Sequence, residues 1–177
     1  MTRAGGVEEI KTYENFPVRL VAVAVLVNIS IYAVGAIILS GYGNLAAALY
    51  LFYCLGNEVH VMKMSCVDCY YYGKWCALGK GKAASFLFKR GDPGRFTARA
   101  ISWKELLPDM LVLMIPLVGG IALLIQGFSL SRLLMLAFLL ALSLGGNYLV
   151  RSKIACAYCK QRELGCPAEQ FFSKQRS

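Results

Sequence analysis

The segment that decides the fold is Leu20–Asn57, which reads LVAVAVLVNISIYAVGAIILSGYGNLAAALYLFYCLGN. Its 38 residues include no formal charge, and a membrane-spanning helix needs about 20 apolar residues. The stretch is therefore nearly long enough for two spans. Residues 40–44 (SGYGN) supply the turn between them. The segment predicts a helical hairpin in a membrane.

A second hairpin is predicted further along the chain. An uncharged run extends from Met110 to Ser131, is interrupted by Arg132, and continues from Leu133 to Val150, with its turn expected at residues 126–129 (QGFS). Hydrophobic residues make up 58% of the 177 residues and charged residues only 16%, which is too apolar for an ordinary soluble domain of this size. The expected fold class is an all-α integral membrane protein with four transmembrane helices.

The basic residues predict the orientation of these helices. Of 19 Lys and Arg, three precede the first span, nine lie from Lys63 to Lys104, six follow Val150, and Arg132 is near the short turns. Because Lys and Arg collect on the cytoplasmic side of membrane proteins, we expect a multi-pass cell-membrane protein with both termini and the central loop in the cytoplasm. The net charge of +9 then reflects topology, with the bilayer and its anionic headgroups as partners rather than nucleic acid.

One cysteine pattern occurs twice, once after each predicted hairpin. Each copy is a C-x-x-C pair followed, after six residues, by a third cysteine, and the two copies contain six of the seven cysteines. The two triplets are Cys66, Cys69 and Cys76, and Cys156, Cys159 and Cys166. The repetition of both spacings predicts a paired cysteine site.

The cysteine repeat belongs to a larger duplication with an offset of 90 residues. At this offset Tyr13 corresponds to Trp103, Asn57 to Asn147 and Lys63 to Lys153. We expect a single membrane domain, 1–177, with repeat 1 at about 13–80, a basic aromatic cytoplasmic linker at 81–102, and repeat 2 at about 103–170. Two parallel-repeat hairpins related by an axis along the membrane normal would bring the cysteine triplets together.

Clustered cytoplasmic thiolates predict a metal site, because cytosolic reductants keep simple disulfides reduced and a C-x-x-C pair can place two thiolates on one metal. The spacing resembles the binuclear zinc cluster of fungal transcription factors, in which two C-x-x-C-x6-C units share two zinc ions. The resemblance implies that all six cysteines are ligands and that one from each half bridges the metals. It covers only the two motifs, which are separated by 79 residues here, and it does not imply DNA binding.

Other arrangements stay open. Each triplet could hold an iron–sulfur cluster with a further ligand. The two C-x-x-C pairs could also share one tetrahedral zinc, or each triplet could hold one zinc completed by a different residue type. Possible additional ligands are Glu58 and His60, where the second span ends, and Asp109, where the third begins. His60 is more readily interpreted as an interfacial histidine, because its counterpart in the second half is Val150.

The segment from Tyr70 to Lys104 combines aromatic and basic residues. It is interpreted either as an interfacial segment with rings at headgroup depth or as a surface for a partner or an anionic substrate. The interfacial interpretation is favoured. The aromatic members are Tyr70, Tyr71, Tyr72, Trp75, Phe86, Phe88 and Phe96.

No catalytic constellation is evident, so whether the chain is an enzyme stays open. The sequence favours a membrane protein whose cytoplasmic cysteine cluster binds metal, preferably zinc, and clamps the two hairpins, as an accessory or assembly subunit of a membrane complex. One alternative is an iron–sulfur or thiol-based electron-transfer protein. The other is an enzyme acting on lipid at the cytoplasmic boundary.

Overall fold

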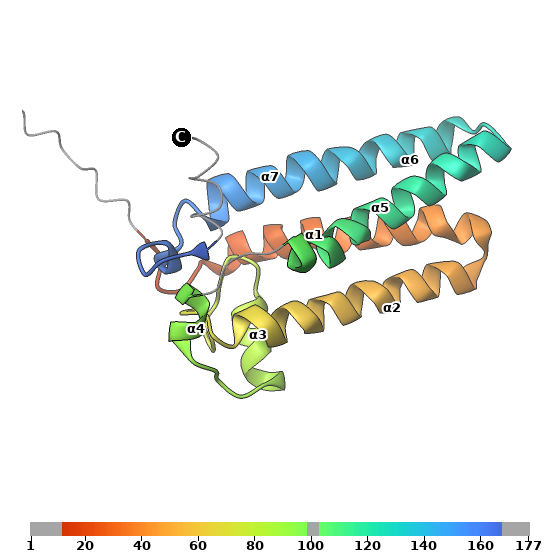
Figure 1. Ribbon diagram of the computed structural model, residues 1–177. Helices are drawn as coiled ribbons and strands as arrows, with labels where there is room; N and C mark the ends of the chain where they lie inside the picture. The colour runs from red at the N-terminus through yellow and green to blue at the C-terminus, as the bar shows by residue number, and fades with distance from the viewer. Residues whose placement is uncertain (1–11, 99–102, 168–177) are drawn as a thin grey trace, which may run out of the picture.

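The computed structural model describes residues 12–98 and 103–167. Residues 99–102 of the expected linker and the end of repeat 2 after residue 167 lie outside the described residues. Four helices are long and apolar enough to cross a membrane: Val18–Tyr42, Asn44–Cys66, Trp103–Gln126 and Leu130–Ala155. They run side by side as a bundle (Figure 1).

These four long helices contain shorter elements of different winding. The first consists of α1 (Val18–Leu39) and the 3-10 turn η1 (Ser40–Tyr42), and the second of α2 (Asn44–Val61) and the π-helical η2 (Met62–Cys66). The third is α5 (Trp103–Gln126), and the fourth runs through α6 (Leu130–Leu140), η3 (Ala141–Gly146), α7 (Asn147–Leu149) and η4 (Val150–Ala155). The remaining elements are α3 (Lys80–Leu87), α4 (Pro93–Ala98) and η5 (Lys160–Arg162).

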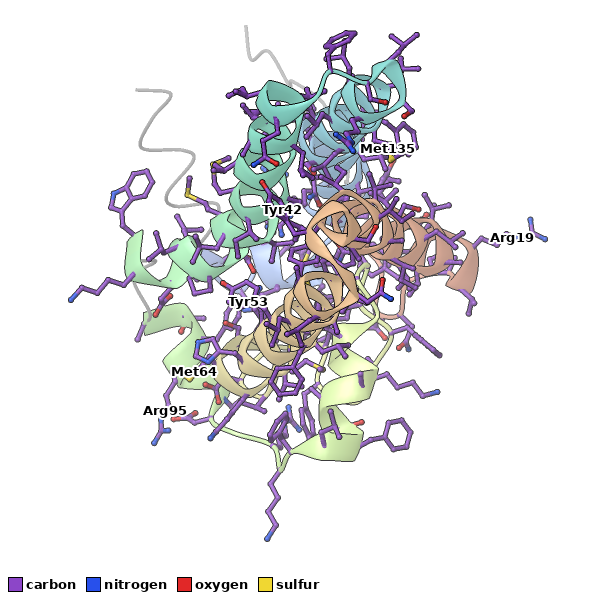
Figure 2. All side chains as sticks on the ribbon, turned by 90° about the vertical axis from the view of Figure 1, so that its right-hand side faces the viewer. Arg19, Tyr42, Tyr53, Met64, Arg95 and Met135 are labelled. Carbon is purple, nitrogen blue, oxygen red and sulfur yellow. The ribbon has the colours of Figure 1, made fainter. Side chains whose placement is uncertain are left out.

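The bundle is held together by an apolar core and by tyrosine hydroxyls that reach the neighbouring backbone. Ile31, Tyr50 and Leu139 are buried in this core. The Tyr50 hydroxyl donates to the Val112 carbonyl at 2.8 Å, and Tyr53 donates to Pro108 at 2.9 Å. These bonds satisfy polar groups inside an apolar bundle and tie α2 to α5, and Figure 2 shows Tyr53 on the side of α2 that faces α5.

The two ends of the bundle differ. The tight turns, η1 and residues 127–129, lie at one end, as the sequence predicts. Both cysteine segments, α3, α4 and residues 12–17 gather at the other end (Figure 1). A second apolar cluster lies there, with Phe16, Val21, Tyr71 and Ala77 at its centre. The fold thus places all six repeated cysteines at one end of the bundle.

Candidate metal centre

The two C-x-x-C pairs adopt the same local turn. The amide of Cys69 donates to the carbonyl of Cys66 at 3.4 Å, and the amide of Cys159 donates to that of Cys156 at 3.5 Å. The π-helical η2 ends at Cys66, the first cysteine of its pair, and η4 ends at Ala155, the residue before Cys156. The equal spacing in sequence therefore corresponds to an equal backbone conformation.

In both turns a backbone N–H group lies against the sulfur of the second cysteine of the pair. The amide of Tyr71, two residues after Cys69, is hydrogen-bonded to the Cys69 sulfur. The amide of Gln161 makes the equivalent bond to Cys159. N–H donors of this kind favour the thiolate form of cysteine, which is the form that binds metals.

The third cysteine of the first triplet receives an amide from α3. Gly81 donates to the Cys76 sulfur at 3.2 Å. A Cβ on Gly81 would lie only 2.2 Å from the carbonyl oxygen of Tyr71 and 2.9 Å from that of Lys74. Only glycine allows this approach, so Gly81 sets the position of α3 over the first triplet. The sequence-based boundary between repeat 1 and the linker, at residues 80 and 81, falls inside α3.

Gln161 of the second segment joins the two triplets. Its side chain is buried, with 4% of its surface exposed. Its Oε1 atom accepts from the Tyr70 amide at 2.8 Å and from the Cys69 thiol at 3.7 Å. The Cys69 sulfur is also close enough to Cys159 and Cys166 to interact with them electrostatically. The structure therefore brings cysteines of both triplets together.

Residues 12–17, here called the N-terminal strap, cross both cysteine segments. The Tyr13 amide donates to the Tyr158 carbonyl at 3.0 Å, and the Tyr13 carbonyl accepts from the Tyr71 hydroxyl. The same hydroxyl accepts from the Lys160 amide at 2.9 Å. Tyr71 is 2% exposed, so its hydroxyl links the strap and both segments within a buried space.

Further contacts tie the strap to each segment. Phe16 is buried, and its amide donates to the Trp75 carbonyl at 2.9 Å. On the second segment, Lys160 pairs with Glu14 at 2.9 Å. This pair is exposed and contributes little by itself, whereas the buried aromatic contacts hold the strap in place.

When no cation is bound, burial determines the pKa values of the buried thiols. It raises the pKa of Cys69 to about 12 and that of Cys159 to about 11, despite the amide donors. A bound metal reverses this preference, since it deprotonates a coordinating thiol. The donor chemistry of the site therefore suits a thiophilic cation such as zinc.

The side chains of the described cysteines do not point to one common centre. Among residues 12–98 and 103–167, no group of three or more His, Cys, Asp or Glu side chains is arranged to hold a metal ion. Cys156 is exposed, whereas the other five repeated cysteines are partly buried. Coordination requires these side chains to turn toward one another from the backbone arrangement described above.

The polar residues at the span boundaries have different surroundings. Glu58 accepts from the Tyr32 hydroxyl and pairs with Lys80 at 2.8 Å. Asp109 accepts from Asn57 at 2.7 Å. His60 is exposed. Glu58 lies near enough to Cys66 to act on it electrostatically, and both Glu58 and Asp109 act electrostatically on Tyr32.

Sequence reasoning did not identify Tyr13, Tyr71, Gly81 and Gln161 as residues of the site. Tyr71 was grouped with interfacial aromatic residues, and the structure corrects this, because its ring belongs to the buried cluster below the bundle. The sequence contains one indication of the role of Gly81, since Gly79 and Gly81 flank Lys80 shortly after the first cysteine triplet. The strap depends on contacts between distant residues that no local pattern encodes.

Comparison with protein-family models, with curated proteins and with solved structures found no match.

Proposed function

We propose that this chain is a small multi-pass membrane protein whose six repeated cysteines bind zinc at the cytoplasmic face and clamp two helical hairpins together. The observation that carries the proposal is the duplicated turn, in which each C-x-x-C pair receives an equivalent amide donor at its second sulfur. The proximity of Cys69 to Cys159 and Cys166 supports a site shared by both halves.

Membrane insertion is the physical setting of the proposal. The four apolar helices carry large apolar side chains on their surface, such as Phe52, which is 78% exposed, and Ile125, which is 82% exposed. A surface of this kind is suited to contact with lipid. By the positive-inside bias we expect the cysteine end to lie in the cytoplasm, where reducing conditions keep the thiols available for metal.

The clamp has an energetic rationale. When ligands come from two parts of a chain, metal affinity becomes folding free energy. Without the metal, the cysteine end relies on the strap, the Tyr71 hydroxyl and Gln161. A rigid metal-bound end would then present a docking surface, as expected for an accessory or assembly subunit of a membrane complex.

Electron transfer through an iron–sulfur cluster is the second candidate. Amide donors to sulfur are also the devices that tune such clusters, so the observed N–H···S bonds suit both metals. The two candidates differ in their spectra and in their iron content.

Elemental analysis of the full chain, purified anaerobically from membranes, tests the proposal. We expect zinc bound in an amount stoichiometric with the chain, no iron, and a fall in thermal stability when a chelator removes the zinc. Iron together with absorbance near about 400 nm would replace zinc with the electron-transfer candidate. A chain that contains neither zinc nor iron, and whose melting temperature a chelator does not change, would overturn both candidates.

A further inference from the structure

The short helix α3 has an apolar outer face with no partner among the described residues. Gly81 and Ala84 are buried against the cysteine segment. On the other side Phe86 is 80% exposed and Leu87 is 58% exposed. Ala83 is exposed as well, and residues three and four apart lie on one helical face.

The beginning of α3 lies beside two of the membrane-length helices, in the part of each that is nearer the cysteine end. A Cβ on Gly79, the residue before α3, would lie 3.3 Å from Val21 and 3.5 Å from Val25 of α1. Lys80, the first residue of α3, pairs with Glu58 near the end of α2 at 2.8 Å. In the membrane placement proposed above, this part of the helices lies near the level at which acyl chains give way to headgroups.

The cations of this segment surround the apolar face. Residues 80–90 contain four Lys or Arg and no acidic residue. The Lys82 ammonium lies 4.6 Å from the centre of the Trp75 ring, which keeps its position defined. Lys89 and Arg90 follow α3 after Phe88 and are exposed. An apolar face bordered by cations complements an anionic lipid surface in both chemistry and charge.

We propose that α3 is an interfacial anchor that binds anionic phospholipid beside the cysteine centre. Phe86 and Leu87 enter the acyl-chain region, and Lys82, Lys89 and Arg90 contact headgroup phosphates. The inference rests on the membrane placement proposed above. Because α3 also supplies the Gly81 amide to Cys76, bound lipid would hold the helix that closes over the first triplet.

The headgroup contacts are tested by lipid retention. The full chain, purified in detergent, is mixed with anionic and zwitterionic phospholipids that have the same acyl chains, and the retained lipids are counted by native mass spectrometry. Each cation at an anionic surface accounts for about a fivefold preference, so Lys89→Gln with Arg90→Gln should lower the anionic preference by at least that factor. Arg132→Gln, at the opposite end, should leave it unchanged. An undiminished preference in the double variant overturns the proposal.

The depth of α3 is tested with a single tryptophan. In a chain with Trp75→Phe and Trp103→Phe, the variant Phe86→Trp is reconstituted into vesicles of lipids brominated on the acyl chains. We expect quenching of its fluorescence, as for a matched Phe52→Trp on the exposed face of α2. Quenching at position 52 without quenching at 86 overturns the anchor but keeps the membrane placement. Absence of quenching at both positions overturns both.

Discussion

The two cysteine segments share a backbone turn but differ in what surrounds it. The first is covered by α3, with Gly81 seated on Cys76 and Tyr71 buried beside it. In the second, Cys156 is exposed, and the short η5 is the element that follows the C-x-x-C pair up to Arg162. The duplicated spacing thus accounts for the shared turn, whereas residues that differ between the two halves, such as Tyr71 and Gly81, account for the difference in burial.

Gly81→Ala should break the first segment most severely. The added methyl group would overlap the Tyr71 carbonyl oxygen at 2.2 Å, and backbone cannot move aside as a side-chain tip can. We expect a loss of about 3 kcal/mol in the free energy of unfolding, measured by denaturant titration in detergent, together with reduced metal content.

The matched control is Gly56→Ala, where an added Cβ meets nothing within 4 Å. Its stability should stay unchanged or rise slightly, because alanine favours a helix over glycine. Equal stabilities of the two variants would show that α3 does not sit on the first segment as described.

Tyr71→Phe should weaken the connection between the segments. The variant keeps the ring but removes the hydroxyl that accepts from Lys160 and donates to Tyr13. Two buried backbone groups then lose a partner, which should cost about 2 kcal/mol. Hydrogen exchange should rise in the strap and in the second segment together.

Tyr72→Phe is the control for this change. The Tyr72 hydroxyl donates to the Phe88 carbonyl at 2.7 Å, entirely within the part of the chain next to the first segment. The Tyr72→Phe substitution should leave hydrogen exchange in the second segment unaffected. An identical exchange pattern in both variants would contradict the linking role of Tyr71.

The Glu14–Lys160 pair should have the smallest effect, visible mainly in the pH dependence. The hydrogen bond from Lys160, followed by its charge, lowers the pKa of Glu14 below 4.5, so the contribution of the pair is present above that pH and is lost as the pH falls through the lowered pKa. The pKa of Lys160 is raised above 10.5, so the contribution is lost again as the pH rises through the raised value. In thermal melts at a series of pH values, Glu14→Gln should lack the fall in melting temperature at acidic pH that the pair causes, and its dependence on salt. If the fall at acidic pH is the same in the variant, the pair is not its source.

The large-scale architecture could be predicted because it depends on local composition. Uncharged runs and glycine-containing turns predicted the four membrane-length helices, with turns at η1 and at residues 127–129. The gathering of the cysteines at one end follows from two hairpins of similar length. Cys54, the cysteine outside the repeated pattern, is 1% exposed and belongs to the apolar core of the bundle.

The contacts of the site could not be predicted because they join residues far apart in the chain. The Tyr71 hydroxyl contacts Tyr13 and Lys160, which are 58 and 89 positions away. Asn57 and Asn147 correspond at the offset of 90 residues, yet the Asn57 amide donates to Asp109 of α5. A carboxylate is the stronger acceptor, and helix packing decides which polar groups meet.

The central claim, that both cysteine segments supply one metal site, is tested most directly by the metal content of Cys69→Ala. Cys69 lies near sulfurs of both triplets, and Cys54→Ala is the control because Cys54 is buried in the bundle. Elemental analysis of anaerobically purified protein should find that Cys69→Ala loses more than half of the metal, with Cys54→Ala unchanged. Loss of no more than half, with the remainder held by the second triplet alone, would contradict a shared site.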